Sequence, residues 1–129
     1  IFPDGYHCNP KLPLPFIKDR SPMAIFSILE PHTHIPPHNG MLNTRLICHL
    51  PLIVPENCRL RVGNHTRIVE EGKMLIFDDS IEHEAWNDSD DVRVILLFEI
   101  WRPELSADEV KALTALYEAV NLYPQSGSA

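Results

Sequence analysis

The chain has 129 residues, of which 44% are hydrophobic and 22% charged, and its formal net charge is -7. This length and composition fit one globular domain and exclude an intrinsically disordered chain. The negative charge argues against nucleic-acid binding, because a phosphate backbone requires a basic surface. The longest apolar run, residues 94–98, is far shorter than the roughly 20 residues that cross a bilayer, and no signal peptide is evident. We therefore expect a cytoplasmic domain without a membrane span, and the start at Ile1 suggests a fragment of a longer protein.

Prolines dominate the first part of the chain, at positions 3, 10, 13, 15, 22, 31, 36 and 37. Proline removes a backbone donor and fixes φ, which disfavours both helix and central strand. We predict an extended, proline-rich arm over residues 1–22. The next segment, residues 24–29, is short and rich in β-forming residues, and it ends at Glu30-Pro31. It is predicted to be the first core strand.

Further short apolar runs follow, separated by Asn, Gly, Pro or acidic residues that interrupt strands. They cover residues 44–50, 58–62, 67–69, 73–77, 83–86 and 92–101. Many short strands at close spacing indicate a sandwich or barrel. The predicted fold is therefore all-β, with a jelly-roll core over residues 23–103.

One helix is predicted after this core, over residues 106–121. Ser106 and Glu109 form a capping box at its start. Apolar residues then recur at helical spacing, at Val110, Leu113, Leu116, Tyr117 and Val120. Their common stripe can pack on the sheet. Residues 125–129 are predicted to be a frayed tail.

The three cysteines, Cys8, Cys48 and Cys58, are odd in number and show no CxxC spacing. A disulfide framework or a cysteine-only zinc site is therefore not expected. We predict buried, free thiols.

Two histidines are candidates for a metal site. His38 follows two prolines and precedes Asn39-Gly40, a rigid setting for a preorganised ligand. His83 lies in a later strand, so the pair would join two segments that are far apart in sequence. Two imidazoles bind borderline metals such as iron and leave coordination positions open for reactants. For His32 and His65 we favour ordinary loop or hydrogen-bonded roles, although an extended segment 33–36 would put His32 and His34 on one face.

Residues 72–87 resemble the second cupin motif, G-x5-P-x-G-x2-H-x3-N. Gly72, His83 and Asn87 match this pattern, whereas Asp78 and Ser80 stand where proline and glycine are usual. The motif supports the jelly-roll prediction.

A more specific resemblance joins residues 30–40, 43–50, 71–84 and 92–93, which in this order resemble the aspartyl/asparaginyl β-hydroxylase family. The similarity covers residues 26–103. It implies a double-stranded β-helix, which is a jelly roll, and an Fe(II)- and 2-oxoglutarate-dependent oxygenase that consumes O2. By this resemblance His38 and His83 are the catalytic iron ligands. Asp79 matches an acid near the metal that could hold a water, and its alternative role is to stabilise a turn.

Gly40 stands where most 2-oxoglutarate oxygenases have a carboxylate ligand. The same glycine is found in the family, so its presence supports the assignment. It implies an iron with only two protein ligands, bound weakly.

The resemblance also implies a 2-oxoglutarate site. Arg93 matches the family's cosubstrate arginine, and the guanidinium fork suits the far carboxylate of a dianion. Ser27 matches a hydroxyl that assists the same carboxylate, and His49 a residue near the metal-side carboxylate. The animal enzymes have an arginine where this chain has Ile47, which weakens the expectation of a peptidyl aspartate substrate. The other nearby arginines could compensate, but solvated surface charge is the favoured interpretation for Arg45, Arg59 and Arg61.

The predicted function is hydroxylation of an unactivated C–H bond, with the β-carbon of a peptidyl Asp or Asn, or a lipid acyl chain, as candidate substrates. Two alternatives stay open, because jelly rolls host many functions. One is a cupin-type metalloenzyme that uses no 2-oxoglutarate, which would be favoured if Arg93 pointed away from the metal. The other is a noncatalytic jelly-roll binding module, which would be favoured by failure to bind any divalent metal.

Overall fold

The computed structural model describes residues 15, 17 and 24–122. The predicted arm over residues 1–22 and the predicted tail lie outside the described residues, apart from Pro15 and Ile17, which are both buried. The described part contains eight strands and one helix. In chain order these are β1 (Ala24–Leu29), β2 (Thr33–His38), β3 (Arg45–Ile53), β4 (Cys58–Val62), β5 (His65–Ile68), β6 (Leu75–Phe77), β7 (His83–Asn87), β8 (Arg93–Trp101) and α1 (Ala107–Leu122).

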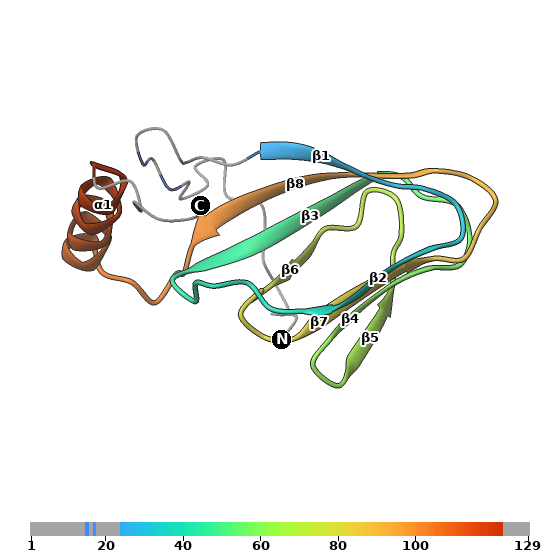
Figure 1. The fold of residues 1–129 in the computed structure, drawn as a ribbon, viewed down its shortest axis with the longest axis horizontal. Helices are drawn as coiled ribbons and strands as arrows, with labels where there is room; N and C mark the ends of the chain where they lie inside the picture. The colour runs from blue at the N-terminus through green and yellow to red at the C-terminus, as the bar shows by residue number, and fades with distance from the viewer. Residues whose placement is uncertain (1–14, 16, 18–23, 123–129) are drawn as a thin grey trace, which may run out of the picture.

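The strands form two four-stranded sheets, ordered β1-β8-β3-β6 and β2-β7-β4-β5. All neighbouring strands are antiparallel, and the two sheets face each other as layers (Figure 1). Successive strands therefore alternate between the sheets through much of the chain, as in a jelly roll. The predicted all-β, cupin-like fold with a C-terminal helix is confirmed.

The core lies between the two sheets. Both sheets contribute to its main cluster, which contains Ile47, Cys58, Leu60, Val62, Val69, Phe77, Ala85 and Ile95. Because side chains alternate across a strand, inward positions are fixed by the register. Arg93 pairs with Leu29, and Ser27 with Ile95, so all four residues share the inner face of the first sheet. Polar residues can therefore be held among apolar ones.

Strand β2 contains both Pro36 and Pro37, which the sequence alone disfavoured as strand residues. It lies at the edge of its sheet, where prolines are tolerated because fewer backbone donors need partners. Its pairing with β7 shifts in register between Ile35 and His38, after which His38 pairs directly with His83. The regular pairing of β2 with β7 therefore stops at the two prolines and resumes, in a shifted register, at His38. His32 precedes the strand at a positive φ of 52°, so it does not share a face of β2 with His34.

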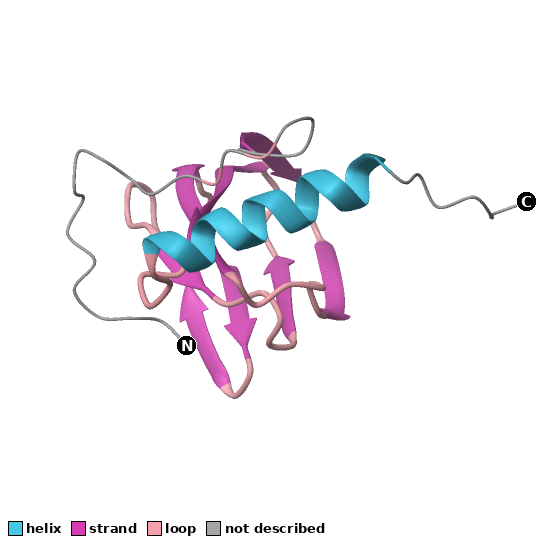
Figure 2. Cartoon of the chain, turned by 90° about the vertical axis from the view of Figure 1, so that its left-hand side faces the viewer, coloured by secondary structure: helices cyan, strands magenta, loops and turns pink. Residues whose placement is uncertain are grey.

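Helix α1 begins as the capping box predicts: Ser106 N–H donates to Glu109 Oε2, and Glu109 N–H donates to Ser106 Oγ. The prediction that the apolar stripe of α1 packs on the sheet is wrong, because α1 lies across one end of the sandwich and not along a sheet face (Figures 1 and 2). Leu116 and Val120 consequently stay 55% and 49% exposed. Tyr117 connects α1 to the residue before β3, because its hydroxyl forms a 3.0 Å hydrogen bond with Thr44 Oγ1.

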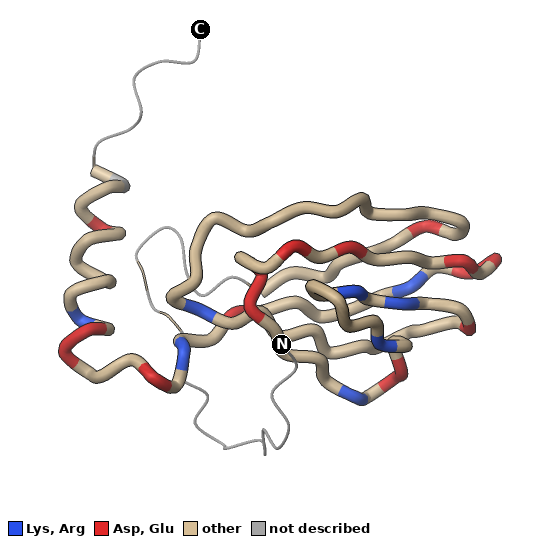
Figure 3. Tube along the Cα trace, turned by 90° about the horizontal axis from the view of Figure 1, so that it is seen from below, with Lys and Arg blue, Asp and Glu red and all other residues tan. Residues whose placement is uncertain are grey.

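Basic and acidic residues are interspersed along the described elements (Figure 3). Among these elements, α1 is too short and too polar to cross a bilayer. Cys48 and Cys58 are buried free thiols, as predicted, whereas Cys8 lies outside the described residues.

Candidate functional site

His38 and His83 meet at the start of the β2–β7 ladder. Their ring centroids are 4.2 Å apart, with the rings tilted by 58°. His83 is buried and His38 is exposed. Since a metal–imidazole bond is about 2.0–2.1 Å long, this separation allows both rings to bind one ion.

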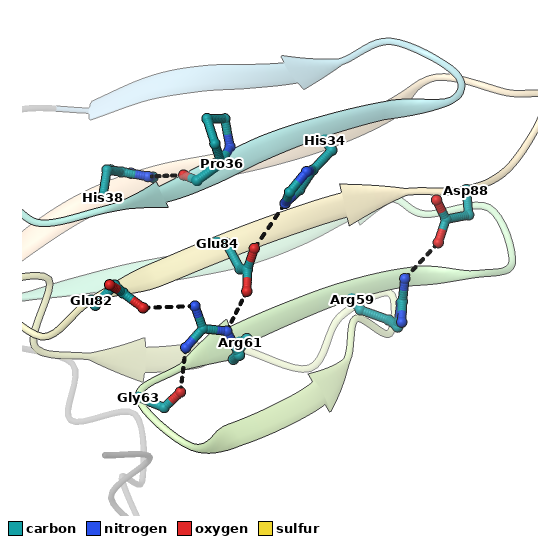
Figure 4. A network of polar contacts seen from close by, with 9 residues as sticks. All are labelled: His34, Pro36, His38, Arg59, Arg61, Gly63, Glu82, Glu84 and Asp88. Atoms are coloured by element: carbon teal, nitrogen blue, oxygen red, sulfur yellow. Dashed lines mark hydrogen bonds and ion pairs between the residues drawn. The ribbon is translucent and has the colours of Figure 1, made fainter.

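Both imidazoles are held in the same tautomer. His38 Nδ1 lies 2.8 Å from the Pro36 carbonyl oxygen, and His83 Nδ1 lies 2.8 Å from the Ile81 carbonyl oxygen. A carbonyl only accepts, so each Nδ1 carries the proton and each Nε2 keeps its lone pair. Metal-binding histidines commonly show this arrangement, because the second-shell acceptor orients the ring. The first of these bonds is drawn in Figure 4.

The electrostatics at His83 also favour the neutral ring. Burial lowers the pKa of His83, and nearby His38 lowers it further, against the opposing effects of the Ile81 carbonyl and Asp79. Because a metal binds only neutral imidazole, the lowered pKa keeps His83 competent as a ligand in mildly acidic solution.

Asp79 fills the space that Gly40 leaves. A Cβ built on Gly40 would lie 2.3 Å from Asp79 Oδ2, and the Gly40 N–H donates to the Asp79 backbone oxygen at 2.6 Å. Asp79 Oδ1 is buried without a hydrogen-bond partner in the described part of the chain. Burial raises the pKa of this carboxyl, and Arg45 counteracts the shift. The carboxylate of Asp79, from the loop before β7, therefore occupies the space where a side chain at position 40 would lie. Its Oδ1 is available to bind a water or an ion.

Arg45 is part of this site, so its interpretation as solvated surface charge was wrong. Its side chain is only 19% exposed and lies 3.5 Å from Asp79 Oδ2 and 2.8 Å from Glu99 Oε2. Glu99 was not among the predicted site residues. The signal was present, since Glu99 and Arg93 are an even number of residues apart in one strand and must share a face.

Arg93 is buried inside the sandwich, with 2% of its surface exposed. Its Nη2 donates to Ser27 Oγ at 3.3 Å, and its Nε has no partner among the described residues. Burial lowers the pKa of Arg93, and none of the ion pairs in the described chain gives it a carboxylate. A buried cation without a counterion is costly, so this guanidinium is suited to bind an anion.

His49 lies near enough to Arg93 and His83 to be affected by the charge of each. It packs edge-on against Phe77, whose ring also contacts His83, with centroid distances of 5.0 and 5.2 Å. Burial, followed by Arg93 and His83, lowers the pKa of His49 to about 3. His49 is therefore a neutral, inward hydrogen-bonding group. Contacts or charge effects link the six predicted site residues to one another: Arg93 to Ser27, His49 to Arg93 and His83, and His83 to His38 and Asp79.

The remaining histidines of the β2 region have other partners. His32 Nε2 lies 2.7 Å from Asp90 Oδ1, with both side chains exposed, as expected for a surface residue. His34 stacks on Trp86 and lies 2.8 Å from Glu84 Oε2. Glu84 also pairs with Arg61 (Figure 4). The outer faces of β2, β7 and β4 thus carry a separate polar network. Beside it, Arg59 pairs with Asp88 and lies over the Trp86 ring, 4.7 Å from its centroid.

Asn87, which matched the cupin motif, has a structural role: its side chain hydrogen-bonds to several segments of the chain. It is fully buried, and its Nδ2 donates to the backbone oxygens of Leu29, Glu30 and Asp91. Its Oδ1 accepts from Ser89 and from Cys58 Sγ. These bonds join β1, β4, β7 and the loop before β8, so Asn87 fixes the frame in which Arg93 sits.

No group of three or more His, Cys, Asp or Glu side chains in the described part of the chain is arranged to hold a metal ion. An ion on His38 and His83 would thus have two protein ligands and several positions for reactants. The donor set fits a metal that takes imidazole and oxygen ligands, such as Fe(II).

Comparison with known proteins gives a consistent result. Residues 6–103 match the family described as aspartyl/asparaginyl beta-hydroxylase. The chain is 48% identical over 92 residues to the mouse (Mus musculus) aspartyl/asparaginyl beta-hydroxylase, which covers 70% of this chain and 12% of that protein. It is 49% identical over 83 residues to the Rhizobium tropici ornithine lipid ester-linked acyl 2-hydroxylase, covering 62% of this chain and 30% of that protein.

The chain therefore spans only a small part of the length of these relatives. Among solved structures, the cupin domain of Cnp3 from Schizosaccharomyces pombe is similar with a TM-score of 0.56 and 10% identity, over 70% of this chain and 60% of that one. At this identity the likeness concerns the fold.

Proposed function

Because the chain belongs to the aspartyl/asparaginyl beta-hydroxylase family, we propose that it hydroxylates an unactivated C–H bond with Fe(II), 2-oxoglutarate and O2. The single observation that carries the 2-oxoglutarate part is the buried Arg93 guanidinium, which has no carboxylate among the described residues. Overall, R–H, O2 and 2-oxoglutarate give R–OH, succinate and CO2. One oxygen atom enters the product and the other enters succinate.

His38 and His83 would hold the iron through their Nε2 atoms, because each Nδ1 is already bonded to a carbonyl. Iron, when bound, supplies O2 activation coupled to the oxidative decarboxylation of 2-oxoglutarate. Asp79 Oδ1, which has no partner in the described chain, would hold a water beside the metal ligands.

Arg93 and Ser27 would together bind the far carboxylate of 2-oxoglutarate through charge-assisted hydrogen bonds inside the sandwich. His49, kept neutral by its lowered pKa, would donate a hydrogen bond to the carboxylate nearer the metal without adding charge. Phe77 packs between His49 and His83 and excludes water from this part of the interior.

The two alternative functions are less well supported. A cupin-type metalloenzyme without 2-oxoglutarate has no use for an unpaired buried guanidinium, which costs stability in the absence of an anion. A noncatalytic binding module has no need for two adjacent histidines, each with Nδ1 bonded to a backbone carbonyl and Nε2 left with its lone pair.

The test is succinate formation by the purified chain with Fe(II), ascorbate and 2-oxoglutarate. We expect turnover that is lost in His83→Ala and His38→Ala and kept in His65→Ala, which alters an exposed histidine of β5. Binding of Co(II) in place of Fe(II), followed by its absorption spectrum, gives a second readout that is independent of turnover. Unchanged succinate formation in His83→Ala would sink the proposal.

A further inference from the structure

Arg45 and Asp79 form an ion pair in which one donor and one acceptor are left unused. Arg45 Nη2 lies 3.5 Å from Asp79 Oδ2. Arg45 Nη1 and Asp79 Oδ1 are both buried, and neither has a hydrogen-bond partner in the described part of the chain. An arginine and a carboxylate frequently bind through two parallel N–H···O bonds, and buried polar groups without partners are rare. The missing second bond therefore needs a cause.

Glu99 supplies that cause from the neighbouring strand. Its Oε2 lies 2.8 Å from Arg45 Nη1, closer than Asp79 Oδ2 lies to Nη2. In the register of β3 and β8, Glu99 is opposite Ile47 and Arg45 is opposite Trp101, so the two charged residues are diagonal neighbours on the inner face. Their side chains are only 6% and 19% exposed, so little water weakens their attraction. Glu99 thus draws one end of the guanidinium away from Asp79.

The backbone of Asp79 is held from other directions. The Gly40 N–H donates to the Asp79 oxygen at 2.6 Å, and Asn39 Nδ2 donates to the Ser80 oxygen at 2.9 Å. The Ser80 N–H in turn donates to Asp78 Oδ1 at 2.9 Å. Since these bonds hold the loop before β7 in place, the guanidinium acts on the direction of the Asp79 side chain and not on its backbone.

From these contacts, and resting on the iron site of the proposed function, we propose that Glu99 is a positioning residue for the metal site. By holding Arg45, Glu99 keeps Asp79 Oδ1 available for a water beside His38 and His83. Asp79 lies close enough to His83 for their charges to interact. Without the Glu99 carboxylate, the guanidinium would turn both terminal nitrogens to Asp79 and occupy both of its oxygens. Glu99 would thus act on the bound metal through Arg45.

The test measures Co(II) affinity by isothermal titration calorimetry in a double-mutant cycle of Glu99→Gln and Asp79→Ala. Glu99→Gln should weaken Co(II) binding about tenfold, as the loss of an outer-shell contact does. Asp79→Ala should weaken it by a similar factor, and the double variant should bind no more weakly than Asp79→Ala alone. Losses that multiply in the double variant would overturn the inference, because a direct effect of the Glu99 charge on the metal does not require Asp79. Parent affinity in Glu99→Gln would overturn it as well.

Removal of Arg45 gives a second comparison, which decides the question even where Glu99→Gln alone does not fold. If Glu99 acts through the guanidinium, Arg45→Gln and Arg45→Gln/Glu99→Gln should bind Co(II) equally, within about twofold. A tenfold difference between them would contradict the role of Glu99. The control Glu70→Gln removes the carboxylate of an exposed ion pair with Lys73 and should bind Co(II) as the parent chain does.

Co(II) binding by the parent chain separates this inference from the proposed function. If the parent binds Co(II), His83→Ala does not, and the cycle shows no coupling, only the role of Glu99 is wrong. If the parent chain binds no Co(II), the iron site of the proposed function is wrong, and the role of Glu99 is wrong with it.

Discussion

The side chain that Gly40 lacks is replaced in space by the carboxylate of Asp79. A Cβ at position 40 would lie 2.4 Å from Asp79 Cγ and 2.7 Å from Oδ1, closer than non-bonded atoms approach. Gly40 therefore has a steric role, because any larger residue there would displace Asp79 from its ion pair with Arg45.

We predict that Gly40→Ala and Asp79→Ala are strongly coupled. In the parent chain the added methyl group overpacks the site and should cost ~1–3 kcal/mol in the free energy of unfolding. In the Asp79→Ala background the space is open and the same change should cost much less. Urea unfolding of the four proteins measures the coupling.

Gly72→Ala is the matched control for this cycle. Nothing lies near a Cβ at position 72, but its φ of 73° strains any other residue. Its cost of ~1 kcal/mol should therefore be the same with and without Asp79. Equal costs for Gly40→Ala in both backgrounds would show that Asp79 does not occupy this space.

We predict that Arg93→Met separates stability from cosubstrate binding. The guanidinium is buried and carries no ion pair among the described residues, so an apolar replacement of similar length should leave the ligand-free protein unchanged or more stable by ~1 kcal/mol. The increase in melting temperature that 2-oxoglutarate gives the parent chain should disappear. Arg59→Met, at a more exposed arginine paired with Asp88, should keep that increase. A large loss of stability in Arg93→Met would indicate a structural role.

Local sequence patterns were sufficient to predict most elements of the fold. The first strand and Cys58–Val62 match β1 and β4 residue for residue, because breakers flank each apolar run. The capping box predicted the start of α1 for the same local reason. Strand β2 was less evident, since Pro36 and Pro37 are compatible with a strand only at a sheet edge, and edge position is a property of the assembled fold.

The candidate site was less predictable from the sequence than the strands were. Motif resemblance supplied six residues of the candidate site, but it did not indicate that Arg45 would form ion pairs with Asp79 and Glu99. Those contacts join β3, β8 and the loop before β7, and no local pattern encodes such a meeting. The position of α1 at the end of the sandwich was equally hidden, because its apolar stripe is compatible with several docking faces.

We predict that Asn87→Ala is among the most destabilising single changes in the described chain. Removal of the amide takes a hydrogen-bond partner from the buried Leu29 oxygen and from the buried Cys58 thiol, and it also breaks the part-buried bonds to Asp91 and Ser89. Each unsatisfied group costs about 1–3 kcal/mol, so a loss of ~3 kcal/mol or more is expected in urea unfolding. Asn43→Ala, at an exposed position in the loop before β3, should stay within about 0.5 kcal/mol. A small effect at Asn87 would mean that water replaces its amide.

We predict that His49 makes the protein acid-sensitive. Burial lowers the pKa of this residue to about 3, with Arg93 and His83 adding to the shift, whereas an unfolded histidine has a pKa of about 6.5. Between these values the unfolded chain carries a proton that the folded chain does not. Stability must therefore fall as the pH falls below about 6.5, by up to ~1.4 kcal/mol per pH unit from this residue. Since His49→Gln removes the titrating group, its free energy of unfolding should lose less than that of the parent chain when the pH is lowered from about 7.5 to about 5.5. The same substitution at His65, an exposed histidine of β5, is made in parallel as the control for replacing histidine by glutamine. If parent and His49→Gln lose stability in parallel, the acid sensitivity has another source.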